Sequence, residues 1–456
     1  MTRPRRLSTL LALTASLILA CKVGAPDGMA LAGATLIDGT GGPPLKDAVV
    51  VVRRGKIESV GIRDGFQLPR RTREIDLRGR WIIPGLIDAH AHAAQAATWA
   101  PARYLAWGVT TVRDVHGSLN TVIAFRRRGG NEMGGSPRVY AAGAMIDGLP
   151  TTYPDAIGVN GEADARKAVD RLVSSGVDFI KVYSHIDLPV LRAILDEART
   201  FNVPVTAHLG MIDAMNAARS GVASIEHLTG VPEAISSQRS SLLSAHYRGF
   251  FAGWTAFERS WADLDSAALT GAAARLAGEK ITLVPTLILH ETLSRLNDPE
   301  VRRDSALADV PAEPRQEWDV TGMINRAGWT DSEFDAFRRS RPKQDMFVRA
   351  FTRAGGRIAA GTDAPNQLLV PGYSEHREME LLVRAGLSPR EALRAATRNG
   401  AVLLGVDSLG LLAPGKVADL VVLTRDPLKD IRNTRAIEAV MIRGQLLDTD
   451  SIRATW

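Results

Sequence analysis

The sequence predicts an α/β protein built around a parallel β-barrel. Short apolar runs with the character of β-strands alternate with segments of helical periodicity through the middle of the chain, which is typical of repeated βα units. Several of these runs end at a side chain that can bind a metal ion. Because the active site of such a barrel gathers at the C-terminal ends of its strands, these side chains are expected to meet.

The first such run, residues 84–92, ends in His90 and His92 with one small residue between them. In a β-strand, side chains two residues apart point to the same face, so both imidazoles can reach one metal ion. Later runs of the same form carry further metal-binding side chains, namely Lys181, His208, His227 and the carboxylate of Asp363. The recurrence of this pattern favours a metal site over an isolated pair of histidines.

The order of these runs and the residues in them resemble those of the amidohydrolase superfamily, in the branch with a two-metal centre and a bridging carboxylated lysine. The resemblance extends from about residue 30 to about residue 452. The motifs that carry it are Pro-Gly-Leu-Ile-Asp-x-His-x-His (84–92), Gly-Val-Thr-Thr-Val-Arg-Asp (108–114), Asp-Phe-Ile-Lys-Val-Tyr (178–183), Ile-Glu-His (225–227), Gly-Thr-Asp-Ala (361–364) and Pro-Gly-Lys-Val-Ala-Asp-Leu-Val-Val-Leu (414–423). The resemblance implies a (β/α)8 barrel beside a small β-sandwich that the N- and C-terminal segments form together.

Residues 30–80 and 412–456 are rich in short β-like runs and turns, and they are expected to form the two halves of that sandwich, after a linker over 21–29. The barrel is expected over 81–411. Within it, residues 297–342 form a long polar stretch. Long loops of barrels are often functional, so this insertion is expected to be either a lid over the metal rim or a helical surface insertion.

Helix signals support the alternating pattern. Residues 162–175 place apolar side chains on one face and stop before Gly176, a typical C-terminal glycine. Asp187 is expected to cap the next helix, ahead of an early proline. Ser388 and Glu391 flank Pro389 and form a capping box for a later helix.

The resemblance also implies how the ligands are shared between two divalent ions, for which zinc is expected from the imidazole-rich ligands. His90, His92 and Asp363 match the ligands of the more buried ion, and His208 and His227 match those of the other. Lys181 would join the two ions as a carbamate. Its apolar strand would desolvate the amine and favour the neutral, reactive form. A bridging hydroxide would attack the substrate, and Asp363 would pass its proton to the leaving group.

Tyr183 has the same strand parity as Lys181 and is expected to face the same cavity as a catalytic hydrogen-bond donor. The alternatives are that Lys181 pairs with an acid and that Tyr183 packs at the rim. Other residues are interpreted as framework: Arg113 and Asp114 as an internal ion pair, Glu226 as a structural residue pointing away from His227, and His246, His290 and His376 as outside the motifs. His116 and His290 lie close enough to strand ends to reach a pocket.

The predicted activity is hydrolysis of a C–N bond in a small amide, such as a dipeptide or an N-acyl amino acid. Two alternatives remain open. The same centre would suit a cyclic amide, a lactone or a phosphotriester, and a different class of protein, a metal-stabilised binding lipoprotein without turnover, would retain the fold. The sequence leaves the substrate and the oligomeric state open, and a homo-oligomer is possible.

The amino terminus carries Arg3, Arg5 and Arg6 before an apolar stretch over 7–20, which predicts a secretory signal peptide at residues 1–20. It ends at Cys21 and resembles a bacterial lipobox, so the protein is expected to be exported and lipid-anchored at the cell envelope or in the periplasm. Ile18 and Leu19 are less usual lipobox residues, and the alternative is cleavage as an ordinary secreted protein. Cys21 is the only cysteine, which excludes internal disulfides. The formal charge of +6 includes the three signal arginines and is too scattered to favour nucleic-acid binding.

Overall fold

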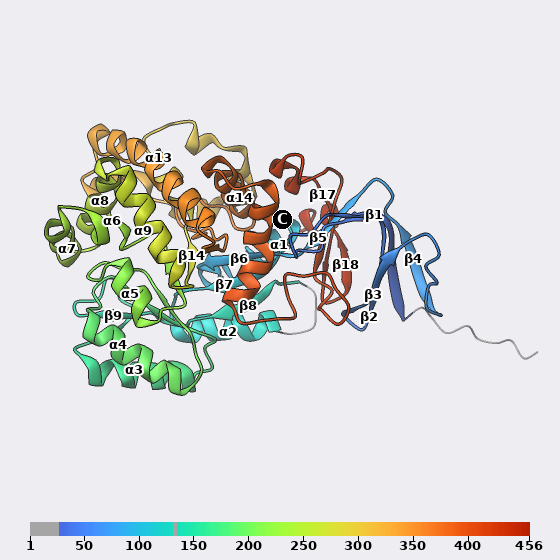
Figure 1. Ribbon diagram of the computed structural model, residues 1–456, viewed down its shortest axis with the longest axis horizontal. Helices are drawn as coiled ribbons and strands as arrows, with labels where there is room; N and C mark the ends of the chain where they lie inside the picture. Colours follow the sequence, from blue (N-terminus) through green and yellow to red (C-terminus); the bar gives the residue numbers. More distant parts are fainter. Residues whose placement is uncertain (1–26, 131–134) are drawn as a thin grey trace, which may run out of the picture.

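The computed structural model describes residues 27–130 and 135–456. It consists of a parallel barrel surrounded by helices and a mixed β-sheet in which both ends of the chain take part (Figure 1). The predicted signal peptide and Cys21 lie outside the described residues. Among those that are described, no helix is long and apolar enough to cross a membrane.

The barrel wall runs through nine short parallel strands. They are β6 (Leu86–Ala91), β7 (Val109–Asp114), β8 (Arg138–Ala141), β9 (Ile146–Gly148), β11 (Ile180–Val182), β12 (Val205–Ala207), β13 (Ser224–Glu226), β14 (Thr282–Val284) and β15 (Arg357–Ile358). A further strand, β10 (Ile157–Val159), pairs with β9.

Backbone hydrogen bonds complete the circuit of the barrel. The amide of Asp178 donates to Ala141 and thereby joins β8 to the chain entering β11, while β9 also pairs with β11, so β8 and β9 act as one barrel strand. The amide of Ala89 donates to Ala360 at 2.9 Å and joins the first strand to the last. The result is the eight-fold parallel arrangement expected from the sequence, with the C-terminal strand ends at one rim.

The helices cover this barrel on the outside (Figure 1). They are α1 (Pro101–Ala106), α2 (Leu119–Gly130), α3 (Glu162–Ser174), α4 (Leu188–Thr200), α5 (Ala214–Ser220), α6 (Val231–Ile235), α7 (Arg239–Tyr247), α8 (Phe250–Ser260), α9 (Ser266–Gly278), α10 (Leu287–Leu293), α11 (Ala312–Glu317), α12 (Val320–Ala327), α13 (Asp331–Arg353), α14 (Tyr373–Ala385), α15 (Pro389–Arg394), α16 (Gly400–Leu403) and α17 (Thr449–Arg453). The caps predicted at Asp187 and Ser388 are confirmed, since each side chain accepts a hydrogen bond from a backbone amide of its own first turn.

The two ends of the chain share one mixed sheet, in the order β18-β17-β16-β5-β1-β2-β3, with β4 paired to β1. Its strands are β1 (Gly28–Leu36), β2 (Leu45–Arg53), β3 (Lys56–Ile62), β4 (Thr72–Asp76), β5 (Trp81–Pro84), β16 (Leu420–Leu423), β17 (Ile437–Ile442) and β18 (Gln445–Asp448). Leu31 and Val50 share a buried cluster with Leu420 and Met441. The layers expected of a sandwich are therefore parts of one continuous sheet, and β5, placed by the sequence at the start of the barrel, belongs to it.

The insertion at 297–342 is helical. It contains two short 3-10 segments, Val301–Arg303 and Ser305–Asp309, then α11, α12 and the first half of α13. Trp329 and Phe334 are buried, so the segment is packed onto the barrel.

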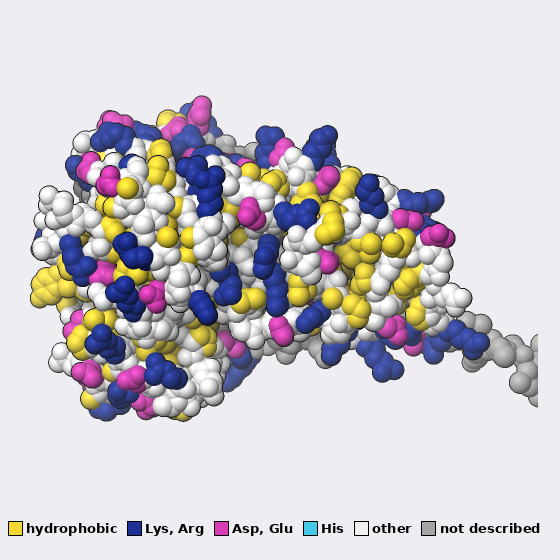
Figure 2. All heavy atoms as spheres, in the orientation of Figure 1, with side chains coloured by type: hydrophobic (Ala, Val, Ile, Leu, Met, Phe, Trp, Pro, Cys, Tyr) yellow, Lys and Arg dark blue, Asp and Glu magenta, His cyan; other side chains and the backbone are white. Residues whose placement is uncertain are grey.

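On the face of the molecule shown in Figure 2, Lys and Arg side chains are interspersed with Asp and Glu.

Candidate metal centre

All predicted site residues line a single cavity of about 380 Å³ at the C-terminal rim of the barrel. They are His90, His92, Lys181, Tyr183, His208, His227 and Asp363. His90 and His92 belong to β6 and the residue after it, and Lys181 and Tyr183 belong to β11 and the residue after it. The other three each follow a different barrel strand, as the spacing of the motifs predicts. The structure therefore brings together residues that are up to 273 positions apart in the chain, from His90 to Asp363.

The tightest group consists of His90, His227 and Asp363, whose candidate ligand atoms lie within 4.8 Å of one another. Oδ1 of Asp363 also lies 3.0 Å from Nε2 of His92. The sequence groups His92, rather than His227, with His90 and Asp363. In the structure His227 is at least as central, and its ring centroid lies 4.4 Å from that of His90.

Protein partners of the histidines leave one ring nitrogen of each available. Nδ1 of His92 lies 3.0 Å from the carbonyl oxygen of His116, which can only accept, so Nδ1 carries the proton and Nε2 holds a lone pair. Nδ1 of His90 lies 2.5 Å from Oε2 of Glu226, which orients that ring in the same way. Nδ1 of His227 lies 2.7 Å from the hydroxyl of Thr286.

His208 and His227 are buried, and their electrostatic surroundings suit metal binding. Burial, reinforced by the positive charge of Lys181 at His208 and by His90 at His227, holds the pKa of both imidazoles well below the ordinary value. Both are therefore neutral at physiological pH, which is the form that binds a metal ion. Nδ1 of His208 is buried and has no hydrogen-bond partner in the part of the chain that the structure describes. A buried nitrogen left in this state fits a metal ligand.

Asp363 is held as an anion. Burial works to raise its pKa, but the adjacent rings of His90 and His92, whose Nε2 atoms each lie 3.0 Å from Oδ1, outweigh it and keep the pKa well below the ordinary value. Its second oxygen, Oδ2, accepts a hydrogen bond of 2.6 Å from Nδ2 of Asn366. An anionic oxygen next to neutral imidazoles completes a donor set that fits divalent ions.

The backbone is strained at two of these residues. His227 has φ of 56° and Asp363 has φ of 64°, both in the left-handed region that side chains other than glycine seldom adopt. Such conformations cost of order 1–3 kcal/mol and persist where surrounding structure enforces them, often at functional sites. At His227 the left-handed conformation ends the extended strand, so the alternation of side chains stops there.

Glu226 corrects an expectation from the sequence. It was expected to point away from His227, but both side chains contact His90, because the left-handed backbone at His227 ends the extended conformation on which alternation depends. Glu226 is fully buried, and its Oε1 accepts hydrogen bonds from Arg113 and Ser224. It therefore supports a candidate metal ligand directly.

The expected ion pair between Arg113 and Asp114 is also wrong. Arg113 donates to Glu226 at 3.2 Å, whereas Asp114 accepts a hydrogen bond of 2.7 Å from the amide of Ala94. Adjacent residues of one strand face opposite sides, so the two side chains cannot meet.

Lys181 is 2% exposed and faces the cavity. Burial lowers the pKa of its amine to about 8, although Glu226 opposes this shift through space. Within the described residues no carboxylate forms an ion pair with it, so the expectation of a lysine paired with an acid finds no support. A pKa of about 8 leaves a fraction of the amine neutral near pH 7, and that form can react with carbon dioxide.

Tyr183 lines the cavity, as its strand parity predicts. Burial raises the pKa of its phenol well above the ordinary value, so the hydroxyl keeps its proton as a hydrogen-bond donor at neutral pH. Its hydroxyl is hydrogen-bonded to that of Tyr153, whose ring lies 5.7 Å away. His116 lines the same cavity, and its Nε2 lies 3.1 Å from Asp155.

The three histidines that the sequence placed outside the motifs serve the fold. His290 is fully buried, stacks on Trp254, and places Nε2 3.1 Å from the carbonyl oxygen of His227, so it supports the site from behind. His246 contacts Glu233, and His376 contacts the carbonyl oxygen of Trp107.

The sequence indicated the outer wall of the cavity only in part. The insertion at 297–342, which was expected to be either a lid or a surface insertion, supplies Met323 and Arg326 of α12. The rest of the outer lining comes from aromatic and apolar side chains of α8 and α10 and from Met145, Thr152, Tyr153, Gln95, Asn366 and Gln367. The last three follow the motifs of His92 and Asp363 closely, whereas tertiary folding brings the side chains of α8 and α10 to the rim.

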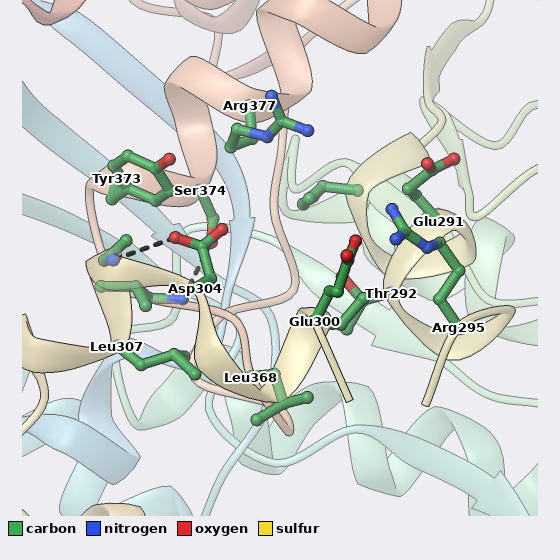
Figure 3. Close-up of a pocket in the computed structure, with 14 residues that line it drawn as sticks. Glu291, Thr292, Arg295, Glu300, Asp304, Leu307, Leu368, Tyr373, Ser374 and Arg377 are labelled. Carbon is green, nitrogen blue, oxygen red and sulfur yellow. Dashed lines mark hydrogen bonds between the residues drawn. The ribbon is translucent and has the colours of Figure 1, made fainter. Parts of the chain in front are cut away.

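A second cavity of about 260 Å³ lies on the other side of α10 (Figure 3). Ile288, Glu291 and Thr292 line it, whereas Leu289 and Leu293 of the same helix line the first cavity. Its charged side chains include Arg295, Glu300, Asp304 and Arg377, and it contains none of the predicted ligands.

Comparison with known proteins decides the family. The model of the amidohydrolase family matches residues 81–447. The chain belongs to the amidohydrolase family. This match covers the barrel and the predicted ligands together.

Relatives of this amidohydrolase support the assignment. The imidazolonepropionase of Pseudomonas putida is 26% identical over 423 residues, which cover 85% of this chain and 90% of the relative. Among solved structures, the bottromycin amidohydrolase is 25% identical with a TM-score of 0.71, covering 95% of this chain and 90% of its own. A Xaa-Pro dipeptidase with bound methionine is 21% identical with a TM-score of 0.67, covering 92% and 100%, and shows likeness of fold. This amidohydrolase is therefore a metal-binding hydrolase that acts on carbon–nitrogen bonds in small molecules.

Proposed function

We propose that this amidohydrolase cleaves the amide bond of a small substrate such as a dipeptide or an N-acyl amino acid. The observation that carries the proposal is the single cavity in which neutral imidazoles, the anionic Asp363 and the buried Lys181 converge beneath an apolar wall. Likeness of fold to a Xaa-Pro dipeptidase adds support, because a dipeptide carries an amide bond of this kind.

The residues that would hold two ions are those the resemblance implies. His90, His92 and Asp363 would serve one ion, His208 and His227 the other, and Lys181 would join them after carboxylation. Two divalent ions bound there, with zinc favoured by the imidazoles, would lower the pKa of a water molecule and polarise the scissile carbonyl. In the carboxylation, the neutral Nζ would form a bond to carbon dioxide and release a proton, giving a carbamate whose single negative charge is shared by two oxygens.

Asp363 would move the proton that amide hydrolysis requires. Its carboxylate is ionised before reaction, so it can accept a proton from the attacking water and deliver it to the leaving nitrogen. An amine leaves poorly unless it is protonated, which makes this transfer decisive for an amide. Tyr183, with its proton retained, would donate a hydrogen bond to the oxygen of the scissile carbonyl.

The test combines metal analysis with a substrate panel. We expect the purified full chain to hold about two divalent ions, and Lys181→Ala to hold fewer. N-acetyl amino acids and dipeptides should be hydrolysed, and lactones and phosphotriesters more slowly. A single ion unaffected by Lys181→Ala would refute the two-metal centre. Preferred hydrolysis of a lactone or phosphotriester would replace the substrate class, and metal binding without turnover of any substrate would favour the binding lipoprotein.

A further inference from the structure

One wall of the metal-lined cavity is built of aromatic rings from α8 and from the loop after β9. The ring of Phe250 stacks on that of Trp254 at 6.0 Å between centroids, and Tyr153 lies 6.3 Å from Phe250. Trp254 in turn lies 6.1 Å from the ring of His208. The aromatic surface therefore begins beside a predicted metal ligand and continues outward toward the rim.

Apolar side chains make up a further part of the lining. Leu289 and Leu293 of α10 and Met323 of α12 line the same cavity and are each nearly buried. A group in contact with them and with the aromatic rings would lose its contact with water. Burial of a large apolar group is favourable under these conditions, whereas a polar side chain without partners would be penalised there.

Arg326 of α12 stands at the outer end of this space. Among the described residues that line the cavity, it and Lys181 are the only ones with a cationic side chain of the lysine or arginine type. Arg326 also lines an outer groove together with Phe251, the residue after Phe250 on α8, so the guanidinium and the helix that carries the aromatic wall border the same two spaces.

The existing partner of Arg326 leaves it free to bind a substrate. Nη1 lies 2.9 Å from Oδ2 of Asp319, but the side chains are 59% and 57% exposed. Exposed ion pairs of this kind contribute little, and one contact uses only part of the five N–H donors of a guanidinium. A carboxylate is the group that matches the remaining donors in geometry and charge.

We propose that this cavity selects N-acyl amino acids, or dipeptides, whose side chain on the amine side of the scissile bond is large and apolar, with aromatic side chains preferred, and whose free carboxylate binds Arg326. The side chain and the carboxylate branch from one carbon atom, which suits a wall and a cation that border the same space. This inference rests on the proposed amide hydrolysis and names its substrate class.

The first part of the test uses three substrates with the metal-loaded full chain. N-acetylphenylalanine carries both features, N-acetylalanine lacks the large side chain, and N-acetyl-2-phenylethylamine lacks the carboxylate. We expect kcat/KM to be about tenfold or more higher for the first than for either of the others. Equal values for all three would overturn the inference while amide hydrolysis itself stood. Failure to hydrolyse any of them, with turnover of a lactone or phosphotriester, would instead reject the proposed function and the inference with it.

The second part uses Arg326→Gln and a matched control. The variant should lower kcat/KM for N-acetylphenylalanine by about tenfold or more, mainly through KM, because the carboxylate is bound equally before and during reaction. Its activity on N-acetyl-2-phenylethylamine should stay unchanged. Arg303→Gln removes an exposed arginine of the same insertion that lines neither the metal cavity nor the outer groove, and it should alter neither substrate. An equal loss on both substrates in Arg326→Gln would contradict carboxylate binding.

The third part concerns the aromatic wall. Phe250→Ala should reduce the preference for N-acetylphenylalanine over N-acetylalanine. The control is Phe201→Ala, at an exposed phenylalanine that follows the C-terminal end of α4, and it should leave this preference unchanged. Phe250→Leu keeps much of the apolar volume and guards against misfolding of the alanine variant. A preference that survives in Phe250→Leu and in a folded Phe250→Ala would place the side chain elsewhere.

Discussion

The two cavities on either side of α10 both carry charged side chains, but they use them differently. Around the second cavity, three of the charged side chains form ion pairs with neighbouring residues. Glu291 is paired with Arg341 and Arg384, Arg295 with Asp298, and Arg377 with Glu380. In the metal-lined cavity, by contrast, Lys181 has no such partner among the described residues and His208 has a buried nitrogen without one.

This difference separates charge that supports the fold from charge available for chemistry. A carboxylate that already has two arginine partners has little left to offer a ligand, and its removal destabilises the protein. Neutral imidazoles and a desolvated amine lack partners for their nitrogen atoms, and a bound metal ion would supply those partners. The contrast predicts large effects on turnover at the first cavity and effects on stability at the second.

The largest effect is expected at Asp363. Asp363→Asn keeps the shape of the side chain and tolerates the left-handed backbone, because asparagine adopts that conformation more readily than most residues. It removes the proton acceptor, so kcat on an amide should fall by roughly 10²–10⁴. Steady-state kinetics and circular dichroism would check this, and near-normal turnover by the folded variant would refute the role of Asp363.

Tyr183→Phe should have the next largest effect. The substitution removes one hydrogen-bond donor while the ring keeps its packing beside His208, at 4.4 Å between centroids. We expect kcat/KM to fall by about 10²–10³ with little change in melting temperature or metal content. If the variant loses stability but retains its activity per folded molecule, Tyr183 is a packing residue.

A smaller effect is expected from Glu226→Gln. The variant weakens the contact that orients His90, and such losses typically reduce metal affinity by 10–100-fold. Glu233→Gln is a matched control, because Glu233 is a buried acid that contacts a histidine, His246, outside the metal-lined cavity. Competition with a chelator would measure both affinities. Equal affinities in the two variants would show that Glu226 has no particular link to the metal centre.

The smallest effect on turnover is expected from Glu291→Gln, at the second cavity. Burial opposes ionisation of Glu291, but hydrogen bonds from Arg384 outweigh it and lower its pKa from 4.5 to about 2. A lowered folded-state pKa stabilises the protein above pH 4.5, and this stabilisation, up to about 3 kcal/mol, is lost as the pH falls toward 2.

Denaturant midpoints of the wild type and of Glu291→Gln would check this prediction. The difference between them should be full at pH 7 and shrink below pH 4.5, while kcat at pH 7 stays the same. A difference that is independent of pH, or a loss of turnover, would contradict the separation of the two cavities.

Much of the fold and the inner site follows from local sequence patterns. The positions of His90, Lys181, His208 and Asp363 at strand ends were predictable, because the alternation of strands and helices fixes which strand ends share a rim. The helix caps at Asp187 and Ser388 were predictable for a similar reason, since they depend on hydrogen bonds within a few residues. Local patterns of this kind can be recognised in a single sequence.

The rest depends on geometry that local patterns do not encode. The orientation of Glu226 depends on a left-handed backbone at the next residue, which no sequence signal there announces. The wall formed by Phe250 and Trp254 comes from a helix whose apolar face is like an ordinary packing surface in the sequence. Arg326 lies in the insertion at 297–342, but nothing in the sequence distinguishes it from the other arginines there. Their role is a property of tertiary structure.

The mixed sheet has a consequence for the order in which the molecule assembles. β5 lies between β1 and β16, and Pro84 pairs with Leu420, so strands made first complete their hydrogen bonds only with strands made last. Closing so long a loop is costly in entropy and slow. Until the final residues are available, β5 presents an unpaired edge directly before the first strand of the barrel. A chain cut short after residue 411 should therefore expose that edge and associate with other copies through it, even though all the predicted metal ligands are present.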